Sequence, residues 1–292
     1  MRFNEIGQQL RAYRMESGMK AEEIAARLGV SRAALYRYEK GEVIKLDTVK
    51  RLAELLKISP LTLLGIGVEY YSRPIGYLER MRQLEESAEQ ILQVFGPICY
   101  LVTSDQFDSV LSQVFDDASE QTGVDRSMAR VAAEQILSTL TSRKRMFLNR
   151  RPAITAVFTV DSIRRFLADG LAAFLPLSDR MRGICRETAQ REVERMAELM
   201  ESEPIGLQFG LISGADPNGP FLLLRGRERA TLAINPFATD TAPSAQTGVA
   251  MITSAEDAVV AHQRVAENIW RDAIKGVSAA RQMREMLAAV RG

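Results

Sequence analysis

The sequence predicts an α+β protein in which an all-α head of five helices precedes a larger, mixed α/β body with an antiparallel sheet. Two observations predict this. The first 67 of the 292 residues hold short apolar patterns at helical spacing, separated by glycines and capping residues. The later residues alternate long helical patterns with short apolar and β-branched runs, which are typical of strands packed against helices.

The composition is that of an ordinary globular protein, with 46% hydrophobic and 26% charged residues. No stretch reaches the roughly 18 apolar residues of a membrane-spanning helix, and the first residues lack the apolar segment of a secretory signal. Cys99 and Cys185 stand far apart in apolar or helical stretches, so we expect two reduced, buried thiols. These features predict a cytoplasmic protein with no membrane contact.

The net charge of +1 hides an uneven distribution along the chain. Residues 1–67 contain 12 basic and 8 acidic side chains, a net +4, whereas the remainder has 26 basic and 29 acidic side chains, a net −3. A basic module joined to a mildly acidic one favours a nucleic-acid-binding head on a body that does not touch nucleic acid.

Five helices are expected in residues 1–67, the predicted first domain. Glycines end the first three helices, a serine caps the third, and a Ser-Pro pair starts the last. The expected helices are Asn4–Met15, Lys20–Leu28, Ser31–Lys40, Asp47–Lys57 and a short one after Ser59-Pro60.

Residues 68–95 are predicted to be a connecting segment, with a linker at about Gly67–Gly76 and one long amphipathic helix over Tyr77–Phe95. The apolar stripe of that helix is expected to pack on the body. Because the segment joins head to body, a helix that forms a dimer interface is the competing interpretation.

The body, residues 96–292, is expected to mix helices and strands. A strand is predicted at Ala153–Val160, and an antiparallel meander is predicted from three apolar runs. These runs are Ile205–Ile212, Phe221–Leu224 and Ala230–Ile234, and a further strand is expected at Val249–Thr253. The expected helices are Asp125–Arg150, Asp161–Ala168, Leu177–Glu201, Ala255–Ile274 and Ser278–Val290, with a loop at Pro236–Thr247.

One spacing in the head carries a functional prediction. Ala25 stands four residues before Gly29, and Ser31 follows two residues later, with Glu39 and Gly41 at the end of the next helix. A small residue allows two helices to approach closely, and glycine permits the left-handed turn between them. Such a helix, tight turn and second helix can project the second helix into the major groove of DNA.

The head resembles the XRE family of phage-repressor-like helix-turn-helix proteins over about residues 3–66. The matching stretches are GQQLRAYRMESGM, EEIAARLGVSRAALYRYEKGE and LDTVKRLAELLKISP. The resemblance places Arg32, Ala33 and Arg37 where the family reads base edges, and Lys40 where it contacts phosphate. Tyr36 is expected to point outward from the same helix. Arginine matches the acceptors of guanine, and alanine can touch a thymine methyl.

The resemblance also assigns supporting roles. It implies that Arg14 and Glu39 form an ion pair that ties the first helix to the end of the recognition helix. Ser31, the predicted cap of the recognition helix, is also expected among the DNA-binding residues, together with Lys20 and Ala21. The family usually begins its second helix with a glutamine that holds phosphate, where this chain has Ala21. Lys20, the preceding residue, is expected to compensate at the DNA backbone.

The body lacks a recognisable catalytic constellation, so the protein is not expected to be an enzyme or to bind a metal or cofactor. His262 is the only histidine, neither cysteine has a CxxC partner, and no phosphate-binding loop is present. Seven aromatic side chains could line an apolar ligand pocket, although an ordinary core is the favoured interpretation. They are Phe147, Phe158, Phe166, Phe174, Phe209, Phe221 and Trp270.

Several body stretches resemble a C-terminal domain of unknown function that follows XRE heads in actinobacterial regulators. These are ICYLVTSDQFDSVL, RSMARVAAEQILSTL, RRPAITAVFTVDSIRR, GPFLLLRG and ATLAI. The resemblance implies an effector-sensing or protein-interaction domain, and we expect residues 96–292 to serve effector sensing and dimerisation. The favoured function is thus a homodimeric transcription regulator that binds an inverted-repeat operator in double-stranded DNA and responds to a small-molecule or protein effector. The alternatives are a DNA-binding antitoxin partner of a toxin and an enzyme fused to a DNA-binding head.

Overall fold

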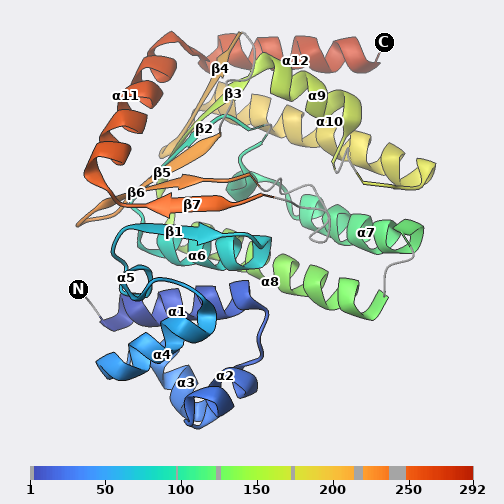
Figure 1. The fold of residues 1–292 in the computed structure, drawn as a ribbon. Coiled ribbons are helices and arrows are strands. Elements are labelled where there is room, and N and C mark those ends of the chain that lie inside the picture. The colour runs from blue at the N-terminus through green and yellow to red at the C-terminus, as the bar shows by residue number, and fades with distance from the viewer. Residues whose placement is uncertain are drawn as a thin grey trace.

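The computed structural model describes residues 3–96, 98–122, 126–171, 175–213, 220–236 and 248–291. The small helical head lies at one end of the molecule, and the sheet and long helices of the body lie above it in Figure 1. This arrangement confirms the predicted α+β fold. Three predicted features fall outside the described residues, wholly or for the most part. They are Phe174, one of the seven aromatic residues considered for a ligand pocket, the loop at Pro236–Thr247 and the turn before Pro220.

The five predicted helices of the head are all present, with ends within two residues of those expected. They are α1 (Phe3–Ser17), α2 (Ala21–Leu28), α3 (Arg32–Glu39), α4 (Leu46–Leu56) and α5 (Pro60–Leu63). Their caps are local: Gly29 adopts a left-handed conformation after α2, and the Ser59 hydroxyl accepts a hydrogen bond from the Leu61 amide before α5.

The connecting segment differs from the prediction. Residues predicted as a linker form strand β1 (Val68–Tyr71), and the predicted helix Tyr77–Phe95 is divided into helix α6 (Pro74–Ser87) and strand β2 (Gln90–Val94). Strand β2 lies in the middle of the sheet and pairs with a strand on each side. Cross-strand pairing therefore outweighs the helical periodicity that this part of the sequence carries.

The body contains one eight-stranded sheet in the order β1-β7-β6-β5-β2-β3-β4-β8. The remaining strands are β3 (Ala153–Thr159), β4 (Leu207–Ile212), β5 (Phe221–Arg225), β6 (Ala230–Ile234), β7 (Ala250–Thr253) and β8 (Ile274–Lys275).

The sheet is mixed rather than antiparallel throughout. Strands β5, β6 and β7 form an antiparallel meander, but β4 pairs in parallel with β3 and is separated from β5 by two strands, β2 and β3. The predicted meander was therefore wrong for its first strand. The two helices between β3 and β4 supply the long connection that parallel neighbours need.

The helices of the body are η1 (Tyr100–Val102), α7 (Asp105–Thr122), α8 (Arg126–Arg150), α9 (Val160–Asp169), α10 (Asp179–Ser202), α11 (Glu256–Asp272) and α12 (Gly276–Arg291). Helix α11 lies alone on one side of the sheet in Figure 1 and packs on alternate residues of β5 and β6, such as Leu223 and Leu232. The intervening residues, such as Leu224 and Ala233, face the core that the other helices build.

That larger core is continuous from the body into the head. Side chains of α1, α6, α8 and α10 belong to a single cluster of buried residues. Among the described residues, no helix has the length and apolar character to cross a membrane.

Candidate nucleic-acid interface

Helices α2 and α3 are joined by a tight turn at the end of the molecule farthest from the sheet. Gly29 has φ +70°, and the amide of Val30 donates to the carbonyl of Ala25 at 3.0 Å. The Ser31 hydroxyl accepts a hydrogen bond from the Ala34 amide at 3.1 Å and so caps α3. The turn and the cap together fix the direction in which α3 leaves α2.

The angle between the two helices is filled by apolar side chains. Leu35 and Ala25 are buried in it, and Val30 packs against them from the turn. Helix α1 supports α3 from behind, because a Cβ atom on Gly7 would clash with the backbone carbonyl oxygen of Tyr38. Only glycine allows the two backbones this approach, so α3 is held rigidly on its inner side.

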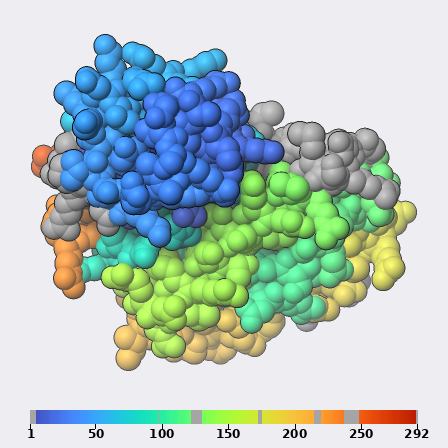
Figure 2. Space-filling view, turned by 90° about the horizontal axis from the view of Figure 1, so that it is seen from below, coloured from blue at the N-terminus to red at the C-terminus, as the bar shows by residue number. Residues whose placement is uncertain are grey.

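The outer side of α3 carries most of the residues that the sequence assigned to DNA. Ala21 alone is buried, at the start of α2. The exposed residues are Lys20, Ser31, Arg32, Ala33, Tyr36, Arg37 and Lys40. Seen from below in Figure 2, the head, in blue, lies on the face of the molecule that is turned toward the viewer.

Both exposed arginines of α3 are held by glutamates from outside that helix. Arg32 lies 2.7 Å from Glu22 and also donates to the Tyr36 hydroxyl at 3.1 Å. Its hydrogen bond to Tyr36 and the charge of Glu22 raise the pKa of Arg32, so the side chain stays cationic. Arg37 donates to Glu42 at 2.8 Å. Each guanidinium on the outer side of α3 therefore has a carboxylate partner within the head.

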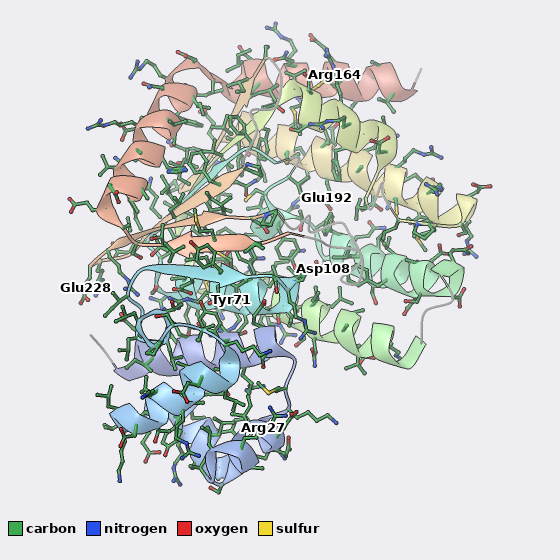
Figure 3. All side chains as sticks on the ribbon, viewed as in Figure 1. Arg27, Tyr71, Asp108, Arg164, Glu192 and Glu228 are labelled. Atoms are coloured by element: carbon green, nitrogen blue, oxygen red, sulfur yellow. The ribbon has the colours of Figure 1, made fainter. Side chains whose placement is uncertain are left out.

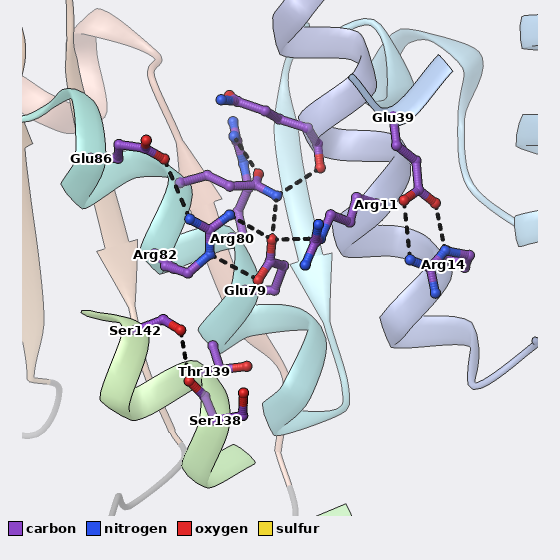
Figure 4. Close-up of polar contacts among 12 residues, drawn as sticks. Arg11, Arg14, Glu39, Glu79, Arg80, Arg82, Glu86, Ser138, Thr139 and Ser142 are labelled. Carbon is purple, nitrogen blue, oxygen red and sulfur yellow. Dashed lines mark hydrogen bonds and ion pairs between the residues drawn. The ribbon is translucent and has the colours of Figure 1, made fainter. Parts of the chain in front are cut away.

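Arg14 and Glu39, which the sequence assigned as an ion pair, lie within hydrogen-bond distance of each other (Figure 4). The Nε and Nη2 atoms of Arg14 donate to the two carboxylate oxygens of Glu39 at 2.5 and 3.1 Å. Burial alone would lower the pKa of Arg14, but the hydrogen bond and charge of Glu39 reverse this and raise it. The pair joins α1 to the last turn of α3.

We expect Glu39→Ala to lower the stability of the full chain by about 1–3 kcal/mol, because it leaves the partly buried Arg14 without its acceptor. Thermal unfolding followed by circular dichroism measures this change. Glu42→Ala is the matched control, since it removes an exposed partner of Arg37 from the same region. Equal melting temperatures for the two variants would exclude the structural role of Glu39.

Sequence analysis missed a buried polar cluster that joins the head to the body. Glu69 on β1 accepts from Gln9 of α1 at 2.9 Å, from the Tyr71 hydroxyl at 2.7 Å and from Arg80 of α6 at 2.8 and 2.9 Å. Tyr71, labelled in Figure 3 between head and sheet, stacks on Tyr13 of α1 with 5.0 Å between ring centroids. The cluster fixes α1 on the body.

The charges in this cluster stabilise the protonated form of Arg80. Burial alone would lower the pKa of Arg80, but the neighbouring Glu69 carboxylate raises it above its usual value. Burial also raises the pKa of Tyr71 well above that of a free tyrosine, so its hydroxyl stays protonated and donates a hydrogen bond to Glu69. Arg80 directly precedes Met81 of the predicted apolar stripe, and this position next to the buried face is a signal that sequence reasoning could have used.

Further contacts reinforce the junction along α1. The carboxylate of Glu16 accepts from the Ser72 amide at 2.6 Å and from the Arg73 amide at 3.1 Å. Arg11 and Arg82 both contact Glu79 of α6, at 3.0 and 2.9 Å (Figure 4). The head is thus attached through α1, β1 and α6 rather than through a linker.

Helix α6 has no free apolar face for a partner chain. Its residues from Pro74 to Met81 are buried, and it packs between α1 and α8. Its C-terminal end is held by Glu85, which accepts two hydrogen bonds from Arg143 of α8 at 2.6 and 2.8 Å. The interpretation of this segment as a dimer-forming helix was therefore wrong, because the fold of the single chain already uses its surface.

The body residues singled out in the sequence are mostly core. Five of the phenylalanines are buried: Phe147, Phe158, Phe166, Phe209 and Phe221. Trp270 is half-buried and lines a cleft.

The titratable residues considered for chemistry lie apart from one another. The His262 ring lies 2.8 Å from the carbonyl of Ala258 and packs edge-on against Phe221. Cys99 and Cys185 are both buried, and burial raises the pKa of Cys99 to about 12. Within the described ranges, His, Cys, Asp and Glu side chains form no group of three or more that could hold a metal ion.

Comparison with known proteins finds similarities in the head. Residues 5–64 match the profile of a helix-turn-helix domain. The chain is also 32% identical over 126 residues to a Pyrococcus horikoshii protein named "Putative HTH-type transcriptional regulatory protein". That match covers 41% of this chain and 38% of the relative, so the chain spans well under half of its length.

A solved structure of TrmBL2, an archaeal chromatin protein with a novel mode of DNA binding, gives a TM-score of 0.32 at 12% identity. The alignment covers 78% of this chain and 61% of that one, and a score this low does not establish a common fold. The profile match over residues 5–64 agrees with the geometry of α2 and α3, so the amino-terminal part of this chain resembles a helix-turn-helix domain in both sequence and structure.

Proposed function

We propose that the protein is a sequence-specific DNA-binding transcription regulator of the XRE type that acts in the cytoplasm. The observation that carries this proposal is α3, a capped helix on a rigid support with a fully exposed outer side rich in arginine. The helix-turn-helix match over residues 5–64 and the name of the Pyrococcus relative both support it.

The exposed side chains suit the two kinds of contact that such proteins make. Arg32 and Arg37 can each present two donors to guanine O6 and N7, and Ala33 can touch a thymine methyl. Lys40, at the end of α3, and Lys20, before α2, suit contacts with phosphate. Helix α2 starts without a side-chain cap, so the amides of its first turn are available to a phosphate where Ala21 replaces the usual glutamine.

Genomic footprinting of the tagged full-length protein tests this function directly. We expect a limited set of protected sites that share a sequence, and recovery of that sequence by the purified protein in gel-shift experiments. Binding that follows only DNA length and falls steeply with salt, without sequence preference, would contradict the proposal.

We further propose that the protein acts as a homodimer on an inverted repeat. One head of this size contacts few base pairs, and proteins of this class reach specific affinity with two heads on a two-fold site. Since α6 is covered within the single chain, the interface must use another surface.

Light scattering of the full chain at micromolar concentration is expected to give the mass of a dimer. The operator is expected to contain two half-sites with centres about 34 Å apart, or a multiple of that distance. A monomer that binds one asymmetric site tightly would contradict this prediction.

The ion pairs on the outer side of α3 predict that removing the charge of their glutamates increases the affinity of the protein for DNA. Arg32 must leave Glu22, and Arg37 must leave Glu42, before either guanidinium can reach a base edge. Glu22→Gln and Glu42→Gln should each tighten DNA binding about two- to fivefold, because such exposed pairs are weak and the lost charge no longer repels phosphate.

Fluorescence anisotropy with the footprinted operator measures the change. Glu187→Gln is the matched control, because Glu187 forms an exposed pair with Arg191 on α10 of the body. If the head variants bind no more tightly than Glu187→Gln, the glutamates do not compete with DNA for the arginines.

A further inference from the structure

The sheet face under α11 carries an unexpected polar region. Along most of this face the residues that point toward α11 are apolar, such as Leu92, Val94 and Leu223. At one end the register brings polar residues together instead: Gln90 lies opposite Arg225, and Thr155 lies opposite Gln208. Gln90 and Thr155 are half-buried there, whereas Arg225 and Gln208 are exposed to solvent at the edge of this region.

These residues line a cleft of about 200 Å³ between the sheet and the second half of α11. Leu92, Leu223 and Ala266 contribute apolar surface, and Gln263, Glu267 and Trp270 of α11 form the opposite wall. Trp270 is held in place, since its ring lies against Gly210 of β4 and the Nζ atom of Lys275 lies 4.8 Å from the ring centroid. The cleft therefore has a defined shape on both sides.

The polar groups of the cleft are available to a ligand. In the described part of the chain, the side chains of Arg225, Gln90, Thr155 and Gln208 have no hydrogen-bond or ion-pair partner. The one carboxylate in the lining, Glu267, accepts from the Gln263 amide at 2.6 Å rather than from Arg225. One cation without a counter-ion thus stands among amide and hydroxyl groups, beside apolar surface.

We propose that this cleft binds a small organic carboxylate with a flat apolar body. The guanidinium fork of Arg225 matches the two oxygens of a carboxylate, and the neighbouring amides can donate to the same group. Trp270 and the leucine side chains suit a ring. The cleft is smaller than the roughly 300–1,000 Å³ of sites for drug-sized molecules, so the ligand is the size of a substituted benzoate.

The position of Arg225 could couple ligand binding in the cleft to the head. Arg225 is the last residue of β5, and the turn that follows is closed by a hydrogen bond from the Gly226 amide to the Arg229 carbonyl at 3.0 Å. Arg229 lies 3.6 Å from Glu5 of α1. A ligand that moves Arg225 would therefore change a contact with the head, and this consequence rests on the proposed DNA-binding function.

The test uses the fluorescence of Trp270, the only tryptophan of the chain. The full-length protein is titrated with benzoate and with phenylacetate, and in parallel with benzamide and phenylacetamide. We expect at least one of the two acids to change the emission in a saturable way at about 1 mM or below, and its amide to bind at least tenfold more weakly.

Two variants locate the site. Arg225→Gln should weaken binding of the acid at least about tenfold, whereas Arg227→Gln, two residues further along and paired with Glu89, should leave it unchanged. The proposal is overturned if neither acid binds, if the amides bind as tightly as the acids, or if Arg225→Gln binds like the wild type.

A last measurement separates this inference from the proposed function. Operator affinity is measured with and without the acid that binds, in the wild type and in Glu5→Gln. We expect the acid to change the affinity of the wild type and to have less effect on the variant. If the protein binds the operator but neither acid, only the proposed ligand site is rejected. If it binds an acid but no DNA, only the proposed DNA-binding function is rejected.

Discussion

Glu69→Ala is expected to lower the free energy of unfolding by about 3–5 kcal/mol, the largest loss of stability that we predict for one side chain. Glu69 is buried and accepts hydrogen bonds from Gln9, Tyr71 and Arg80. Without it, the guanidinium of Arg80, which is only 2% exposed, stays charged and buried with no counter-ion. Urea unfolding of the full chain measures the difference.

Two further variants make this prediction specific. Glu89→Ala removes an exposed partner of Arg227 and should cost less than about 1 kcal/mol. Combining Glu69→Leu with Arg80→Met should restore much of the lost stability, because no unpaired charge remains. Since Glu69 contacts α1, hydrogen exchange should also show faster opening of that helix in Glu69→Ala. A Glu69→Ala protein that unfolds like the wild type would show that the cluster does not hold the head.

The head could be predicted almost residue by residue because its signals are local. Gly29 and Ser31 fix the turn and the start of α3, and Pro60 fixes the start of α5, whatever the rest of the chain does. The same short-range rules place the exposed arginines on one side of a helix. They do not reveal that Glu22 and Glu42 hold those arginines.

The connecting segment could not be predicted because its structure depends on distant partners. Ile91 and Leu92 continue the apolar spacing of α6, yet their backbone groups pair with β3 and β5, about 60 and 130 residues further along the chain. The pairing of Glu69 with Gln9 spans 60 residues in the same way. Long-range pairing decides between helix and strand wherever the local pattern permits both.

The body shows the same division between local and distant information. Its long helices and strand β3 can each be recognised from the residue pattern of their own segment. The order of the strands in the sheet cannot be read from the sequence of any one strand. Strand β4 follows two helices and so can lie parallel to β3, which separates it from the strand that comes next in sequence. The cleft under α11 depends on this strand order, because residues of the four neighbouring strands β5, β2, β3 and β4 line it.

Arg32→Ala and Arg37→Ala are each expected to weaken binding to the specific operator about five- to a hundredfold and to relax preference at one base pair. Each arginine can present a fixed pair of donors to one guanine, and alanine leaves the acceptors of that base without a partner. Both side chains lie on the exposed outer side of α3, so neither substitution should alter the melting temperature of the protein.

Comparison with Lys40→Ala distinguishes reading of bases from attraction to the backbone. A phosphate contact carries no sequence information, so Lys40→Ala should weaken binding to operator and random DNA alike and reduce the dependence on salt. The arginine variants should lose affinity for the operator but little for random DNA, and Arg191→Ala in the body should behave as the wild type. Selection of binding sites from a random pool by each variant measures the preference base by base. If both arginine variants recover the wild-type operator sequence with unchanged affinity, α3 is not the helix that reads DNA.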